Sequence, residues 1–283
     1  MPTPPLSDPG TSADPLADPL ATQEANAGPP RRPPRRGIYL LPNLLTTGSI
    51  YVGLFAIISA TDGHFLIAGK VVFIAMVLDA MDGRIARLTN TQTAFGSQYD
   101  SLADMVSFGI TPALVAYLWK LKGLGDLGDL ELGAIAAFIY TTCAALRLAR
   151  FNTQIGRADK RYFQGLASPA AAALVMGLVW TSEEYHLREM YGMGGIALAV
   201  TVVAGLLMVS NVRYHSMKDI TFKDRVPFVA VIAIALGIAV ISLKPCLILF
   251  GGAILYAGSG PILTLEQMRR HRLARRHGLP PPT

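Results

Sequence analysis

Long apolar segments recur along the chain, and they constrain its fold more than any other feature of the sequence. Most of them approach the length of about 20 residues that a helix needs to cross the hydrocarbon core of a bilayer. Only 16% of the 283 residues are charged, whereas soluble domains carry about 25%. Because the apolar segments repeat along the chain, a soluble helical protein with a large core explains the sequence poorly.

We therefore predict an all-α polytopic membrane protein with about eight transmembrane helices. The connections between the segments are short, so helices that are adjacent in the sequence should be antiparallel neighbours. The expected spans cover residues 41–60, 64–81, 101–120, 132–150, 166–180, 193–211, 226–243 and 247–265.

The distribution of basic residues predicts the orientation of these spans. With the N-terminus in the cytosol, most of the 25 Lys and Arg residues fall in cytosolic loops and span ends, as the positive-inside rule requires. We expect a multi-pass protein of the inner, cytoplasmic membrane with both termini in the cytosol. The net charge of +6 then reflects orientation and contact with anionic membrane lipids, and we expect no nucleic-acid partner. The outer side would hold only Lys120, Lys122, Arg188 and Lys244.

Two segments flank the expected transmembrane domain of residues 38–265. Residues 1–37 are rich in Pro, Ala, Asp and Thr and lack apolar periodicity, so we expect a disordered cytosolic extension. Residues 266–283 form a basic tail, which we expect to lie in the cytosol at the anionic membrane surface.

Four aspartates lie close together between the second and third expected spans. Asp79 and Asp82 are three residues apart, and Asp100 and Asp104 are four apart, so the members of each pair share one helix face. Four like charges at the edge of a bilayer repel one another and lose hydration unless a cation lies among them. An oxygen-only set of ligands suits Mg²⁺ or Mn²⁺. We therefore expect one or two divalent ions at these aspartates.

Small and basic residues between the two pairs suit a metal-bound di- or triphosphate. Gly83 and Ala86 share a helix face and leave room for a bulky group to approach the backbone. Arg87 lies one turn beyond Gly83 and can present two N–H donors to a phosphate. Metal ions that bridge phosphate oxygens can stabilise phosphoryl transfer. A solvated, helix-capping loop remains the alternative for any single aspartate, but it explains all four together poorly.

The stretch from Asp79 to Asp104 meets the pattern D-x2-D-G-x2-A-R-x8-G-x3-D-x3-D at every position. This pattern resembles the signature of the CDP-alcohol phosphotransferases, integral membrane transferases of phospholipid biosynthesis. The resemblance implies transfer of a phosphatidyl group from CDP-diacylglycerol to an alcohol, with release of CMP. It also implies that the four aspartates hold a pair of divalent metals and that Asp104 is the catalytic general base. An ordinary aspartate, with a pKa of about 3.9, would need help from proximity and from a metal to act on an alcohol.

Contacts to the CDP part of the donor follow from the same resemblance. Family members carry a Pro-Asn-x-x-Thr motif at the cytosolic start of the first span. An ordinary helix start with an early proline would also explain these residues. The expected CDP-diacylglycerol contacts are Pro42, Asn43, Thr46, Gly83, Arg87 and Thr93.

Two further stretches bear on the acceptor alcohol. Residues 146–152 read LRLARFN and residues 162–172 read YFQGLASPAAA. They resemble the ARFN and F-x-G-L-P-S-P-A-A-A stretches of the membrane-embedded bacterial and archaeal phosphatidylserine synthases, with Ala167 in place of the common proline. Two arginines three residues apart could bind the serine carboxylate or a lipid phosphate, or they could serve only the membrane orientation. The expected acceptor or lipid-phosphate contacts are Arg147, Arg150, Asn152 and Ser168.

This resemblance favours L-serine as the acceptor and implies a homodimer, which is common in the family. The family signature does not choose the acceptor, so glycerol 3-phosphate or an inositol phosphate stays an alternative. A phosphorylated acceptor would need an additional cationic pocket. A cation transporter that uses the aspartates as its ion path is an alternative of another class, although the acids cluster at one membrane face.

Overall fold

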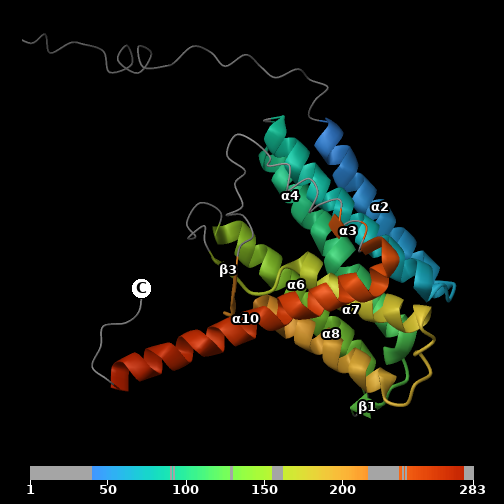
Figure 1. The fold of residues 1–283 in the computed structure, drawn as a ribbon. Helices are drawn as coiled ribbons and strands as arrows, with labels where there is room; N and C mark the ends of the chain where they lie inside the picture. Colours follow the sequence, from blue (N-terminus) through green and yellow to red (C-terminus); the bar gives the residue numbers. More distant parts are fainter. Residues whose placement is uncertain are drawn as a thin grey trace, which may run out of the picture. The chain divides into compact units, whose positions relative to one another are not determined.

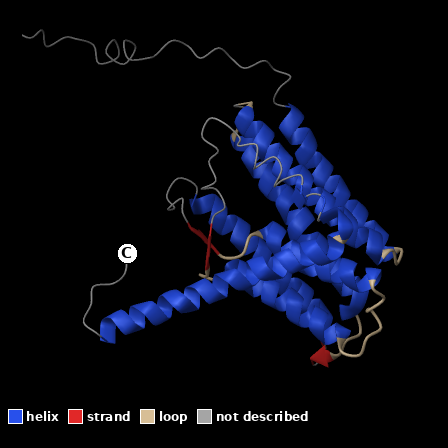
Figure 2. Cartoon of the chain, in the orientation of Figure 1, coloured by secondary structure: helices blue, strands red, loops and turns tan. Residues whose placement is uncertain are grey.

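The computed structural model describes residues 40–89, 91, 93–127, 130–154, 162–215, 236–237, 239 and 241–276. These residues are predominantly helical (Figures 1 and 2). The α-helices are α2 (Leu40–Thr61), α3 (Phe65–Leu88), α4 (Ala94–Asp104), α5 (Thr111–Ala116), α6 (Leu132–Gln154), α7 (Ser168–Glu184), α8 (Met193–Val209) and α10 (Pro245–Arg276). Two π-helical segments, η1 (Met105–Ile110) and η2 (Tyr117–Leu121), extend α4 and α5 into one helical run. Two short antiparallel pairs complete the described structure: β1 (Asp126–Leu127) with β2 (Leu130–Glu131), and β3 (Tyr162–Gln164) with β4 (Arg213–His215).

The helical membrane class that the sequence predicts is confirmed. Within the described residues, four helical runs are long and apolar enough to cross a bilayer: Leu41–Thr61, Ala94–Leu121, Leu132–Thr153 and Pro245–Thr264. Helix α8 is apolar but shorter. The count of about eight spans stays a prediction. Most of the expected span 226–243, all of the expected extension 1–37 and the last residues of the basic tail lie outside the described residues.

The helices around the aspartates are longer than the expected spans. Helix α3 continues past residue 81 to Leu88, and α4 begins at Ala94 rather than at residue 101. Thr93 sets the start of α4, because its hydroxyl accepts a hydrogen bond from the Gly96 N–H at 2.9 Å and so caps the helix. Hydropathy marks only the apolar part of a helix, whereas backbone hydrogen bonding continues into the polar region. Both aspartate pairs consequently lie on regular helix.

A proline removes one backbone donor from this helical run, eight residues after Asp104. Pro112 near the start of α5 has no N–H to donate to the carbonyl of Phe108, four residues earlier. The hydroxyl of Tyr140, from α6, donates to that carbonyl instead at 3.0 Å. The Tyr140 side chain is fully buried. A buried carbonyl without a donor would cost about 1–3 kcal/mol, so Tyr140 stabilises the π-helical segment that follows Asp104.

The same arrangement recurs in α10. Pro261 lies inside that helix and cannot donate to the carbonyl of Ala257. Tyr214 of β4 is fully buried, and its hydroxyl donates to this carbonyl at 3.1 Å. The short strand β4 is thereby tied to α10.

Small residues let the helices approach closely. Helix α2 packs along α3, α3 packs on α7, and α6 packs on α8. A Cβ on Gly69 would lie 2.9 Å from the Trp180 Cβ, and a Cβ on Gly205 would lie 3.0 Å from the Tyr140 Cα. The first distance is shorter than real Cβ contacts, and the second is tighter than nine in ten of them. Gly69 is therefore needed for the α3–α7 contact, and Gly205 favours the close α6–α8 contact.

Candidate active site

The structure brings the four aspartates of α3 and α4 together. Carboxylate oxygens of Asp79, Asp82 and Asp100 all lie within 4.8 Å of one another. The carboxyl group of Asp104 lies within hydrogen-bonding range of Asp79. Within the described part of the chain, Asp104 Oδ1 is buried and has no hydrogen-bond partner. Two helices thus converge on one cluster of carboxylates.

No ion pair among the described residues neutralises this cluster. Among the described residues, the ion pairs within 4.0 Å all involve Glu183, Glu184 or Glu189. Arg147 of α6 interacts electrostatically with Asp104 without forming an ion pair. Among the described residues, the cluster is therefore not paired with a cation of the chain.

These aspartates fit a divalent cation. They offer oxygen donors only, which is the ligand set that Mg²⁺ and Mn²⁺ prefer. Three of the carboxylates are close enough to share one ion. The buried Oδ1 atom of Asp104 lacks a donor in the described structure, and a buried polar atom in that state is costly unless a ligand meets it. The triad of Asp79, Asp82 and Asp100 could thus hold a metal ion.

Thr46 of α2 orients one of the four carboxylates. Its hydroxyl donates to Asp82 Oδ2 at 2.6 Å, and it also lies 3.0 Å from the carbonyl of Pro42. Both side chains are buried, with Thr46 4% and Asp82 3% exposed. A hydrogen bond to a carboxylate is stronger than one to a neutral carbonyl. The Pro-Asn-x-x-Thr motif therefore lies against the aspartates and contributes directly to their geometry.

Other predicted nucleotide contacts lie where α2, α3 and α4 meet. A Cβ on Gly96, one turn before Asp100, would lie 3.6 Å from Asn43 Oδ1. At Gly83, no described atom outside the local helix lies within 4 Å of such a Cβ, so space is open beside the aspartates. Arg87 and Thr93 are exposed, and the Thr93 hydroxyl is engaged in capping α4.

The predicted acceptor contacts separate into two groups. Arg147 donates a hydrogen bond to the hydroxyl of Ser168, at the start of α7, and its charge acts on Asp104. The amide of Asn152 donates to the hydroxyl of Ser101 at 3.0 Å. Ser101 directly follows Asp100 in the sequence. Asn152 thus contacts the helix that carries the second aspartate pair, and Ser168 contacts the arginine whose charge acts on Asp104.

Arg150 is engaged elsewhere. Its Nη2 atom donates to Gln164 Oε1 and, at 3.0 Å, to Asn211 Oδ1. These partners come from strand β3 and from the segment between α8 and β4. The two arginines of the predicted pair therefore have different surroundings, with Arg147 on the side of the aspartates.

The sequence analysis missed an aromatic pair next to the site. The hydroxyls of Tyr99 and Thr47 lie 2.9 Å apart and link α4 to α2. The ring of Phe95 stacks on Tyr99, with the ring centres 6.0 Å apart and the planes at 9°. The sequence could have indicated this pair, because Tyr99 directly precedes Asp100 and Phe95 lies one turn earlier on the same helix face.

Comparison with known proteins agrees with this geometry. The profile of the family described as CDP-alcohol phosphatidyltransferase matches residues 39–212, which include the four aspartates and the residues described around them. The chain is similar to the CDP-diacylglycerol–serine O-phosphatidyltransferase of Helicobacter pylori, with 37% identity over 203 residues that cover 72% of this chain and 83% of the relative. The protein of the same name from Mycobacterium tuberculosis is 32% identical over 242 residues, covering 82% of each chain. The one from Methanocaldococcus jannaschii is 29% identical over 199 residues, covering 70% of this chain and 86% of the relative.

Proposed function

The chain belongs to the CDP-alcohol phosphatidyltransferase family, and we propose that it transfers a phosphatidyl group from CDP-diacylglycerol to L-serine and releases CMP. Relatives named for this reaction resemble the chain over most of both lengths. The structural observation that carries the proposal is the cluster of Asp79, Asp82 and Asp100, whose carboxylate oxygens lie within 4.8 Å of one another. None of the relatives described above is named for glycerol 3-phosphate or an inositol phosphate.

We assign Mg²⁺ or Mn²⁺ to this cluster, with a pair of ions as the full complement. Asp79, Asp82 and Asp100 would hold the metal, and Asp104 would complete the set of ligands. When bound, the metal would offset negative charge on the diphosphate of the donor and on the leaving CMP. The hydrogen bond from Thr46 keeps the Asp82 carboxylate in place for this role.

Asp104 is our candidate for the general base. The oxygen of the serine hydroxyl attacks the phosphorus that bears the diacylglycerol, and the bond from that phosphorus to the oxygen of CMP breaks. The proton of the hydroxyl passes to Asp104, whose Oδ1 atom has no other partner in the described structure. Arg147 lies on the same side, and its guanidinium can bind the serine carboxylate. It would thereby hold the hydroxyl close to the base.

The donor would lie across the meeting point of α2, α3 and α4. We propose that Pro42, Asn43 and Thr46 contact the cytidine part and that Gly83 leaves room for the diphosphate. Arg87 and Thr93 are exposed at the same end and would contact the donor when it binds. Asn152 and Ser168 would position the acceptor side through Ser101 and Arg147.

The orientation in the membrane is also part of the proposal. We place the aspartates at the cytosolic face of the inner membrane, because the basic residues concentrate on that side of the predicted layout. Anionic lipids would contact these basic residues. A homodimer formed through the membrane helices is the expected assembly.

The test is a CMP-release assay with purified protein, CDP-diacylglycerol and a divalent metal. We expect release that depends on added L-serine. Release with glycerol 3-phosphate or an inositol phosphate but not with serine would overturn the acceptor and leave the family reaction intact. No release with any of these alcohols would overturn the proposed enzymatic function.

A further inference from the structure

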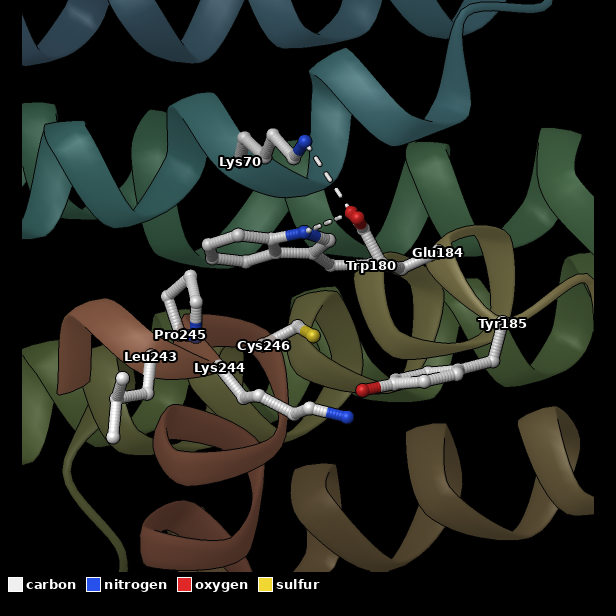
Figure 3. Close-up of a pocket in the computed structure, with 8 residues that line it drawn as sticks. All are labelled: Lys70, Trp180, Glu184, Tyr185, Leu243, Lys244, Pro245 and Cys246. Carbon is white, nitrogen blue, oxygen red and sulfur yellow. Dashed lines mark hydrogen bonds and ion pairs between the residues drawn. The ribbon is translucent and has the colours of Figure 1, made fainter. Parts of the chain in front are cut away.

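A second polar cluster lies away from the aspartates, in a pocket of about 290 Å³ between α3, α7 and the start of α10 (Figure 3). On α3, Lys70 precedes Asp79 by nine residues, which is about 14 Å along the helix axis. On α7, the pocket lies at the end opposite Ser168. The pocket is therefore separate from the candidate active site. Its lining residues are Lys70, Trp180, Glu184, Tyr185, Leu243, Lys244, Pro245 and Cys246.

The pocket holds an excess of positive charge. Lys70 Nζ lies 3.3 Å from Glu184 Oε2, and Trp180 Nε1 donates to the same oxygen at 3.3 Å. Lys244 Nζ lies 5.7 Å from the centre of the Tyr185 ring, and no carboxylate of the described residues forms an ion pair with it. Two ammonium groups thus face one carboxylate. In Figure 3 both ammonium ends are turned toward the side of the pocket where Glu184 and Tyr185 lie.

The remaining lining is suited to the boundary between apolar and polar layers of a membrane. Trp180 and Tyr185 lie at the end of α7, and such residues concentrate at membrane–water interfaces. Lysine can extend its ammonium group to the interface while its stem stays among apolar groups. Leu243 is 78% exposed and, with Pro245, supplies an apolar wall beside Lys244. A ligand that matches this lining is anionic at one end and apolar at the other.

We propose that this pocket binds the phosphodiester headgroup of an anionic phospholipid. The ammonium of Lys244, which forms no ion pair with the described residues, meets the phosphate. Lys70 adds a second positive charge, and an acyl chain lies along Leu243 and Pro245. A free phosphate ion would gain the contacts to charge but not the apolar contact, so it binds more weakly. The proposal uses no residue of the reaction described above and does not depend on it.

The test measures lipid binding to the full-length protein in detergent by native mass spectrometry. The probes are dioleoyl phosphatidylglycerol, dioleoyl phosphatidylcholine and inorganic phosphate. We expect phosphatidylglycerol to bind most tightly. Lys244→Gln should weaken its binding about fivefold, because one lysine near a lipid phosphate contributes about that factor. Glu184→Gln should strengthen binding, because it removes the carboxylate that competes for Lys70.

Lys122→Gln is the matched control, because Lys122 is exposed and lies outside the pocket lining. Its binding of phosphatidylglycerol should equal that of the wild type. Equal losses in Lys244→Gln and Lys122→Gln would overturn the site in favour of general surface charge. Weaker binding by Glu184→Gln would overturn the role given to Lys70. Phosphatidylcholine or inorganic phosphate binding as tightly as phosphatidylglycerol would overturn the assignment to an anionic lipid.

Discussion

Acidic side chains have opposite environments in two regions of this protein. Near the end of α7, each glutamate has a cation within ion-pairing distance. The pairs are Glu184 with Lys70 at 3.3 Å, Glu189 with Lys120 at 3.2 Å, and Glu183 with Arg188 at 3.8 Å. The aspartates on α3 and α4 form no such pair among the described residues, although their oxygens lie within 4.8 Å of one another in the triad.

The difference distinguishes acidic groups that pair with cations of the protein from acidic groups that need a bound ligand to offset their charge. The glutamates are partly exposed and paired, so each pair contributes about 0–1 kcal/mol to stability. The aspartates repel one another, and one of them has a buried oxygen without a partner in the described structure. A cation from outside the chain would compensate such a cluster, which is why we place the chemistry there.

The largest effect expected of a single substitution comes from Asp104. Asp104→Asn preserves the size of the side chain but removes its ability to take the serine proton. We expect CMP release to fall by about 10²–10⁴-fold, with the protein still folded by circular dichroism. Full activity of this variant would show that another group is the base.

Removal of the metal should change CMP release and stability through the aspartate cluster. We expect EDTA to abolish CMP release and added Mg²⁺ or Mn²⁺ to restore it. Metal at about 100 times its dissociation constant should stabilise the wild type by about 2.7 kcal/mol, seen as a higher melting temperature. An Asp79→Asn, Asp82→Asn double variant should lose this shift. Undiminished activity in EDTA would contradict the metal assignment.

The carbonyl that Pro112 leaves without its backbone donor gives a smaller effect. Tyr140→Phe removes the donor to the Phe108 carbonyl, so we expect a loss of about 1–3 kcal/mol and slower CMP release, because η1 directly follows Asp104. Tyr214→Phe is the matched control, since it removes the donor to the Ala257 carbonyl of another helix. Its stability should fall by a similar amount with a smaller change in turnover. Equal effects of both variants on turnover would argue against local support of Asp104 by Tyr140.

The smallest effect is expected at the paired glutamates. Glu189→Gln removes an ion pair whose glutamate side chain is 82% exposed. We expect less than about 1 kcal/mol of lost stability and unchanged CMP release. A large loss of activity in this variant would weaken the distinction between the two regions.

Particular elements show how far the sequence could predict this structure. The spacing of the aspartates correctly indicated that each pair shares a helix, because spacing and helix period are local properties. The π-helical segments were not predicted. Pro112 marks a break in the hydrogen-bond ladder, but the donor that replaces its N–H is a tyrosine from α6. The two arginines of the LRLARFN stretch looked equivalent in the sequence. In the described structure Arg147 acts on Asp104, whereas Arg150 donates to Gln164 and Asn211.

The sequence by itself determined a helical membrane class, a family signature and a cluster of acids, because segment hydropathy and residue spacing need no knowledge of distant contacts. The tertiary structure decided which side chains meet those acids. Thr46 donates to Asp82, the charge of Arg147 acts on Asp104, and Lys70 pairs with Glu184. Each of these contacts joins residues far apart in the chain, so it depends on how the helices rotate and pack against one another.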